Sequence, residues 1–322
     1  MDFWKRIVSF VICCVLASCA LVACGKEQES ALSLKNELAF SVPGELEGQL
    51  NPFFAKTGGD LQVLSVMTER FLSSNGVAQT EATVDKDGIL TVTVTIQEGV
   101  FCYQQSELLA VDFQYAVQFV CDPSYDGPLT ALAGSSIVGL TEFQSGQTKE
   151  LNGIERVDKY TCKVRFSDPN EDYLTLLDLP AVHSANYGGY SYGKCAYSDV
   201  EAKYAKVIGT GPFQLDRLLP TDRKLWNLVP NEYYHLSKVE TRDVTIRHVA
   251  DADVGLNMHL GQLTAGFLYD REQAKVQAEK YDFIAINLAD GALLCHKDAV
   301  FISKLGENMT IYQALVAVMT AK

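Results

Sequence analysis

Residues 89–96 read Ile-Leu-Thr-Val-Thr-Val-Thr-Ile, and this stretch indicates the type of fold more clearly than any other part of the chain. Apolar residues alternate with threonines at a period of two, and β-branched side chains dominate, which is typical of a half-buried β-strand. The preceding Asp87-Gly88 pair is a common turn sequence. Residues 89–96 are therefore predicted to form a strand with one face in a core and the other toward solvent.

The same kinds of pattern predict a mixture of strands and helices on both sides of this stretch. Further strands are predicted at residues 38–42, 159–166, 212–218, 223–229, 243–249 and 281–288, with a hairpin at 212–229. Helices are predicted at residues 61–72 with Asp60 as N-cap and Gly76 as stop, from 112 to 121, at 252–260 with Asp251 as N-cap, and at 311–319. The predicted fold class is therefore α/β, with α+β mixing.

The N-terminus has the three parts of a secretory signal. Lys5 and Arg6 are basic, an apolar run of about 16 residues follows at 7–22, and the segment ends in Leu21-Val22-Ala23-Cys24. The run is shorter than the roughly 20 residues that span a bilayer, although a permanent anchor helix is the alternative. The Leu-Val-Ala-Cys string resembles the bacterial lipobox, which implies lipid attachment at Cys24. Residues 1–23 are then the signal peptide and residues 24–37 a polar linker.

Composition narrows the possible partners. The chain of 322 residues has a formal net charge of −13, which becomes one unit more negative without Asp2, Lys5 and Arg6. An acidic surface repels nucleic acid, so nucleic acid is not an expected partner. The hydrophobic share of 48% is typical of a globular protein.

The cysteines indicate neither a disulfide scaffold nor a zinc site. Four of the nine lie in the signal region. The other five are scattered, odd in number and form no Cys-x-x-Cys pair: Cys102, Cys121, Cys162, Cys195 and Cys295. One disulfide of unassigned partners and free buried thiols both remain open. No two histidines share a helical turn, and neither a metal site nor a cofactor is expected.

Two glycine-containing motifs are similar to known catalytic or nucleotide-binding motifs. Residues 189–193, Gly-Tyr-Ser-Tyr-Gly, match the Gly-x-Ser-x-Gly nucleophile elbow, but the motif has meaning only between a buried strand and a helix. A polar loop precedes it here, so a Tyr/Gly-rich loop is the alternative. Gly209-Thr210-Gly211-Pro212 lacks the lysine of a nucleotide-binding loop. Its glycines are predicted to permit a tight turn with positive φ, and Pro212 to precede a strand.

Several segments, in order along the chain, resemble the extracytoplasmic solute-binding proteins of family 5, which are the oligopeptide, dipeptide and nickel receptors of ABC importers. Residues 49–53 are similar to a Leu-Asp/Asn-Pro loop, residues 87–101 to an Asp-Gly-initiated strand, and residues 109–113 to a Thr-Ala-x-Asp-Val helix start. Asp122-Pro123 resembles the end of that helix, residues 208–213 resemble Val-Gly-Thr-Gly-Pro-Tyr, and residues 230–234 resemble Asn-Pro-x-Tyr-Trp.

The resemblance implies a two-lobe architecture of the type II periplasmic-binding-protein kind. The first lobe is expected at residues 38–280, with an inserted subdomain at about 78–200, and the start of a second lobe at 281–322. Family members are longer, so most of the second lobe is expected to be missing. The sequence also departs from the family pattern at Tyr103-Gln104-Gln105 and at residues 261–264, Gly-Gln-Leu-Thr.

By resemblance, the protein is expected to capture oligopeptides between its lobes and to deliver them to the permease subunits of an ABC importer. It is expected to be a monomer, not an enzyme, and to be held by lipid at the extracytoplasmic face of the cell membrane. The expected ligand-binding residues are Glu45, Leu46, Glu47, Asn51, Tyr233 and Tyr234. Two alternatives are a surface lipoprotein hydrolase that uses Ser191 and a truncated, non-functional remnant of a binding protein.

Overall fold

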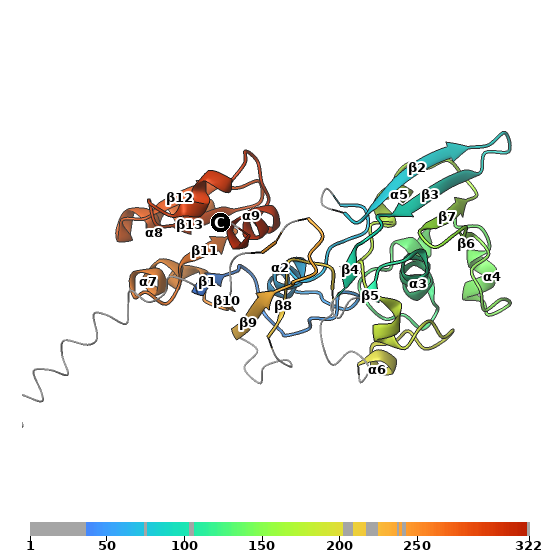
Figure 1. Ribbon diagram of the computed structural model, residues 1–322, viewed down its shortest axis with the longest axis horizontal. Helices are drawn as coiled ribbons and strands as arrows, with labels where there is room; N and C mark the ends of the chain where they lie inside the picture. The colour runs from blue at the N-terminus through green and yellow to red at the C-terminus, as the bar shows by residue number, and fades with distance from the viewer. Residues whose placement is uncertain are drawn as a thin grey trace, which may run out of the picture.

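A computed structural model describes residues 37–73, 76–102, 106–201, 209–216, 225–236, 238–239 and 243–320. These residues form an elongated molecule in which two β-sheets, each with its own helices, lie at opposite ends (Figure 1). The signal-like segment with Cys24 lies outside the described residues. Within the described part, no helix is both long and apolar enough to cross a membrane.

The larger sheet has seven strands in the order β12-β13-β11-β1-β10-β9-β8. Strand β1 lies at its centre and runs parallel to both neighbours, β10 and β11, whereas the outer pairs are antiparallel. The strands are β1 Glu37–Ser41, β8 Phe213–Leu215, β9 Leu225–Pro230, β10 Asp243–Arg247, β11 Ala265–Leu268, β12 Ile284–Asn287 and β13 Ala292–Cys295. The sheet therefore joins strands from both ends of the described chain.

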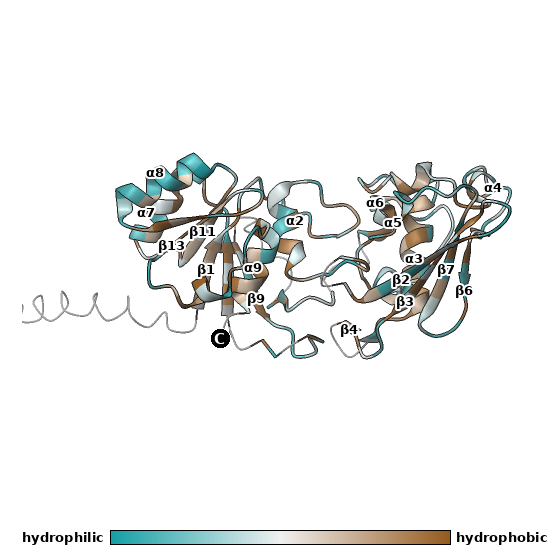
Figure 2. Ribbon diagram, turned by 90° about the horizontal axis from the view of Figure 1, so that it is seen from above, coloured by the Kyte–Doolittle hydropathy of each residue, from teal (hydrophilic) through white to brown (hydrophobic). Residues whose placement is uncertain are grey.

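Four α-helices accompany this sheet: α2 Gly58–Ser65, α7 Val254–His259, α8 Arg271–Tyr281 and α9 Ile311–Met319. The short 3₁₀ turns η4 Asp251–Asp253 and η5 Val300–Lys304 precede α7 and α9. Helix α8 is hydrophilic along most of its surface (Figure 2) and buries only Ala274, Gln277 and Ala278. Helix α9 buries an apolar face and begins with a capping box between Thr310 and Gln313.

The smaller sheet has four antiparallel strands in the order β2-β3-β7-β6. The strands are β2 Ala78–Val84, β3 Leu90–Ile96, β6 Ile154–Arg156 and β7 Thr161–Phe166, with a separate hairpin of β4 Phe101–Cys102 and β5 Ser106–Glu107. The helices at this end are α3 Ala110–Cys121, α4 Leu140–Gln144, α5 Tyr173–Leu176 and α6 Tyr197–Val200, with the 3₁₀ turns η2 Leu132–Gly134 and η3 Ser184–Tyr187. All of these elements fall inside residues 78–200, the range expected for an inserted subdomain.

The strand predicted at residues 89–96 is confirmed in both position and orientation. Leu90, Val92, Val94 and Ile96 are at most 3% exposed, whereas the intervening threonines are half-buried or exposed. The helix predicted from residue 112 is also confirmed, although it begins two residues earlier at Ala110. Asp112 accepts a hydrogen bond from the Leu109 N–H at 2.8 Å and one from the Ser184 N–H at 2.8 Å.

The helix predicted at residues 61–72 is wrong at both ends. Helix α2 spans Gly58–Ser65, and its N-cap is Thr57, whose hydroxyl accepts the Asp60 N–H. After Ser65 the N–H groups of Met67 and Thr68 still donate to the Leu64 carbonyl, and the chain then hydrogen-bonds to two distant segments. Leu61, the first residue of the predicted helix, is 47% exposed.

Two further boundaries near the C-terminus are corrected. Asp251 begins the turn η4 and makes no side-chain cap, because α7 starts three residues later at Val254. Tyr281 ends helix α8, and the strand predicted to start there begins at Ile284, after Asp282 reverses the chain with a φ of 61°. The domain boundary expected at residue 280 falls in the last turn of helix α8, and the strand β12 that follows belongs to the seven-stranded sheet.

Candidate functional site

The segment from Val66 to Phe71 connects the two ends of the molecule, and two other segments hold it by its backbone. On one side the N–H groups of Gly211 and Phe213 donate to the carbonyls of Met67 and Val66, both at 3.0 Å. On the other side the N–H of Ala181 donates to the Glu69 carbonyl, and that of Phe71 to the Leu179 carbonyl, both at 2.9 Å. Residues 66–71 therefore have a fixed position, because most of their backbone groups are paired.

Gly209 and Gly211 make this close packing possible. A Cβ atom at Gly209 would lie 2.1 Å from the Met67 carbonyl oxygen, and one at Gly211 would lie 2.6 Å from the Met67 carbonyl carbon. Neither glycine has a positive φ, so the prediction of a left-handed turn here is wrong. The glycines are needed because two backbones approach each other, and β8 does begin directly after Pro212, as predicted.

Glu69 and His235 form a buried pair beside this connection. His235 Nε2 lies 2.9 Å from Glu69 Oε2, and the side chains are 3% and 2% exposed. The Glu69 N–H donates to the hydroxyl of Thr210, and this hydrogen bond holds the backbone that carries the carboxylate. The second carboxylate oxygen, Oε1, and the second ring nitrogen of His235, Nδ1, have no hydrogen-bond partner. The pair thus leaves one acidic oxygen unsatisfied.

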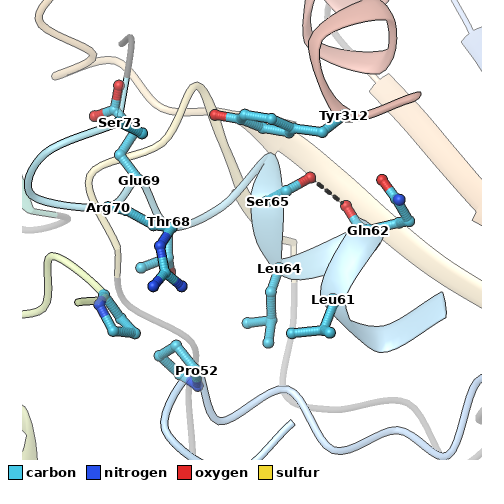
Figure 3. Close-up of a pocket in the computed structure, with 11 residues that line it drawn as sticks. Pro52, Leu61, Gln62, Leu64, Ser65, Thr68, Glu69, Arg70, Ser73 and Tyr312 are labelled. Carbon is cyan, nitrogen blue, oxygen red and sulfur yellow. Dashed lines mark hydrogen bonds between the residues drawn. The ribbon is translucent and has the colours of Figure 1, made fainter. Parts of the chain in front are cut away.

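A cavity of about 270 Å³ opens next to Glu69 (Figure 3). Its walls come from α2, the connecting segment, two prolines and the first turn of α9. The lining residues are Pro52, Leu61, Gln62, Leu64, Ser65, Thr68, Glu69, Arg70, Ser73, Pro180 and Tyr312. In Figure 3 the hydroxyl end of Tyr312 points toward the side where Glu69 lies, whereas Arg70 lies nearer Pro52.

Negative charge surrounds the phenol of Tyr312. Burial, with smaller contributions from the nearby carboxylates of Glu69 and Asp178, raises the pKa of Tyr312 to about 12. Burial and the charge of Glu69 also raise the pKa of Tyr234 above its usual range. Asp178 is itself paired with Arg70, whose Nε lies 3.0 Å from Asp178 Oδ2. Glu69 therefore contributes to the raised pKa of both tyrosines, after burial.

The loop that carries Glu45, Leu46 and Glu47 is tied to the start of α2. The fully buried Asp60 accepts the N–H groups of Gly48 and Gln49, both at 3.0 Å. The Gly59 N–H donates to the Glu45 carbonyl at 3.1 Å. Glu45 and Glu47 have exposed side chains, and Leu46 is half-buried against the core.

The other expected ligand residues lie deeper. Asn51 is 2% exposed, and its side-chain oxygen accepts the Phe53 N–H and the Tyr187 hydroxyl, both at 3.1 Å. Tyr233 and Tyr234 are half-buried, and the Tyr234 ring lies edge-on to His235. None of the six expected residues lines the cavity. Tyr234 lies near it, because the charge of Glu69, which lines the cavity, raises the pKa of Tyr234.

Sequence reasoning missed the cavity residues. Glu69 closely follows the mostly apolar stretch 63–67, and a carboxylate in this position is the sequence signal for the site. Tyr312 lies in the helix predicted at residues 311–319, for which the sequence indicates no contact partner. Only the tertiary packing of α9 against α2 brings Tyr312 to this place.

Ser191 does not lie in a nucleophile elbow. The 3₁₀ turn Ser184–Tyr187 precedes it, and the next helix, α6, begins only at Tyr197. The loop is fixed by Asp122, which accepts the Tyr190 hydroxyl at 2.7 Å and the Gly193 N–H at 3.0 Å. The local geometry is therefore that of an anchored loop rather than the strand–turn–helix that a hydrolase requires.

The cysteines and metal-ligating residues add no site to the described part of the chain. Cys102, Cys121, Cys162, Cys195 and Cys295 are all buried and free. Burial raises the pKa of Cys121, Cys162 and Cys295 to about 12, which leaves them as neutral thiols. Among the same described residues, no group of three His, Cys, Asp or Glu side chains could hold a metal ion.

Comparison with known proteins shows which proteins this chain resembles. Residues 74–287 match the family model of bacterial extracellular solute-binding proteins, family 5 Middle. The oligopeptide-binding protein OppA of Lactococcus lactis subsp. cremoris strain SK11 is 24% identical over 315 residues, covering 84% of this chain and 47% of its own length. The dipeptide-binding protein of Lactococcus lactis subsp. cremoris strain MG1363 is 22% identical over 79% of this chain and 46% of its own.

Solved structures show the same fold. The oligopeptide-binding protein AppA of Bacillus subtilis, in complex with a nonapeptide, has a TM-score of 0.62 at 14% identity, covering 78% of this chain and 48% of its own. Lactococcal OppA, complexed with an endogenous peptide in the closed conformation, has a TM-score of 0.60 at 19% identity, covering 74% and 47%. The chain thus spans about half the length of the relatives that it matches.

Proposed function

Because the chain belongs to the bacterial extracellular solute-binding proteins of family 5, we propose that it is a substrate-binding protein of a peptide ABC transporter, lipid-anchored through Cys24. The observation that carries the proposal is the family match over residues 74–287, which covers two thirds of the chain. The names of its relatives, oligopeptide-binding and dipeptide-binding proteins, favour peptides as ligands. On this proposal the protein is not an enzyme and passes its ligand to permease subunits in the membrane.

The loop at residues 45–51 supports a role in contacting the ligand. It presents Glu45 and Glu47 to solvent while Asp60 fixes its backbone, and a pre-organised loop loses less conformational entropy when it binds. Asn51 would act by holding the loop, since its amide oxygen is already occupied. Tyr233 and Tyr234 would contribute from the connection after β9, and residues 281–322 would lead into the second lobe.

Isothermal titration calorimetry of the folded, full-length protein against a pool of short peptides tests this proposal. We expect heat of binding that saturates, and a weaker affinity when Glu45 and Glu47 are both replaced by alanine. The matched control is Glu81→Ala, which removes an exposed carboxylate from β2, at the far sheet. A folded protein that gives no heat with any peptide pool would contradict the proposal and favour a non-functional remnant.

The lipid anchor has its own test. Cells that express the protein are grown with radiolabelled palmitate, and the label on the protein is compared with that on Cys24→Ser. We expect label on the unchanged chain only and its recovery in the membrane fraction. Equal labelling of both chains, or membrane recovery of the serine variant, would contradict attachment at Cys24.

A further inference from the structure

The cavity beside Glu69 combines an apolar wall with one unsatisfied acidic oxygen. Leu61, Leu64, Pro52 and Pro180 supply apolar surface, and the exposed Leu61 shows that solvent reaches this wall. Glu69 Oε1 is buried and has no hydrogen-bond partner. A buried acceptor without a partner is unfavourable because it has lost its hydrogen bonds to water, so a ligand donor that reached this oxygen would bind favourably.

His235 contacts only one of the two carboxylate oxygens of Glu69. His235 Nε2 faces Oε2, but Nδ1 is buried with no partner, and a proton there would be a buried donor without an acceptor. The pair therefore leaves Glu69 Oε1 as the carboxylate oxygen that no donor contacts. Arg70, the nearest cation on the cavity wall, is paired with Asp178 through its Nε and donates to the Asp178 carbonyl through a second nitrogen.

The size of the cavity limits the ligand. About 270 Å³ is below the roughly 300–1,000 Å³ of pockets that take drug-sized molecules. A single side chain or a small molecule of comparable size fits such a volume. The walls suit a straight aliphatic stem. Three lining residues carry a buried oxygen without a hydrogen-bond partner, Glu69 Oε1, Gln62 Oε1 and Thr68 Oγ1, and such acceptors suit a primary ammonium, which has three donors.

We propose that this cavity is a subsite for a primary alkylammonium group, with its carbon chain between Leu61, Leu64 and the two prolines and its ammonium donating to Glu69 Oε1. The group could come from a lysine side chain of a bound peptide or from a free amine. As a peptide subsite, the assignment rests on the function proposed above. As an amine site, it stands on the cavity alone.

The first test uses the full-length protein and two probes that differ only in the terminal group, n-pentylamine and 1-pentanol. Binding is followed by chemical shifts of ¹³C-labelled leucine methyl groups, assigned with Leu61→Ala and Leu64→Val. We expect the amine to bind about tenfold more tightly than the alcohol, as a charge-assisted hydrogen bond predicts. Equal affinities, or shifts that leave Leu61 and Leu64 unaffected, would overturn the proposal.

Two variants sharpen this test. Leu61→Ala should weaken pentylamine about fivefold, whereas the matched control Leu256→Ala, an exposed leucine on α7, should change nothing. Glu69→Gln should remove the preference for amine over alcohol. If Glu69→Gln fails to fold, the comparison of Leu61→Ala with Leu256→Ala and the comparison of the two probes still test the proposal. Equal effects of Leu61→Ala and Leu256→Ala on pentylamine binding would overturn the assignment.

The second arm separates the two sources of the amine. Tetrapeptides that carry lysine or norleucine at one position are compared by calorimetry on the same protein. A preference for lysine that Leu61→Ala reduces supports a peptide subsite. Binding of pentylamine without binding of any peptide supports a free-amine site and contradicts the proposed peptide function, whereas peptide binding with no lysine preference and no pentylamine binding overturns the subsite alone.

Discussion

His235 Nε2 and Glu69 Oε2 lie 2.9 Å apart in a nearly solvent-free contact, although 166 positions separate the two residues in the chain. The contact joins the turn after β9 to the segment that connects the two sheets. Because Glu69 also lines the cavity, loss of this contact would change the shape of the candidate site.

Loss of the Glu69 side chain should destabilise the protein strongly. We expect Glu69→Ala to lower the free energy of unfolding by about 3 kcal/mol, because it leaves His235 buried without its partner. Urea denaturation followed by circular dichroism measures the change, and Glu81→Ala on the exposed strand β2 should stay within about 0.5 kcal/mol of the unchanged protein. A double-mutant cycle with His235→Ala should show clear coupling, and additive effects would contradict the pairing.

Gly209→Ala should disturb the connection between the two ends of the molecule. The new Cβ would lie 2.1 Å from the Met67 carbonyl oxygen, so the backbone must move, at a cost of about 2–3 kcal/mol. Gly134→Ala is the matched control, since a Cβ there meets nothing within 4 Å and its φ is not positive. Thermal melts of the two variants check this, and equal melting temperatures would show that the approach of the backbones is not tight.

Removal of the Asp60 carboxylate should free the loop at residues 45–49. Asp60→Ala takes away two charge-assisted hydrogen bonds, and we expect amide hydrogen exchange at Gly48 and Gln49 to accelerate at least tenfold. Asp85→Ala is the comparison, because Asp85 also accepts two N–H groups, those of Asp87 and Ile89, but in an exposed turn. It should leave Gly48 and Gln49 unchanged; acceleration by both variants would point to a global loss of stability.

The five buried thiols should resist alkylation in the folded protein. The pKa of Cys121, Cys162 and Cys295 is raised to about 12 by burial, so at about pH 8 almost none is thiolate. Iodoacetamide labelling with peptide mass spectrometry should modify them only in guanidinium. Rapid labelling of these cysteines in the native protein would contradict the burial.

The same thiols give the protein an alkaline limit of stability. Their pKa is higher in the folded state than the usual value of about 9, so the unfolded state loses protons first as the pH rises. Stability from this source is complete below about pH 9 and falls between about pH 9 and 12. Urea midpoints measured across this range, with Cys121→Ser as the comparison, should decline with pH and decline less in the variant.

The elements that sequence alone located are those whose periodicity is strong and local. Strand β3 alternates apolar and polar residues, and α9 carries an apolar face behind a capping residue. The elements that were missed lack such a pattern. Strands β11 and β13 are buried on both faces, β2 is almost entirely exposed, and α8 buries only small or polar residues.

The sequence by itself determined the family, the mixed α/β class and the strand that follows Pro212, because these depend on short motifs and local backbone preferences. The tertiary structure alone decided where α2 ends, that Leu61 is exposed, that Gly209 and Gly211 pack against the Met67 backbone, and that Glu69 pairs with His235. Those contacts arise from the order of strands in the seven-stranded sheet and the packing of α9 on α2. Residues so far apart in the chain carry no local signal of one another, since only the burial of the shared core brings them together.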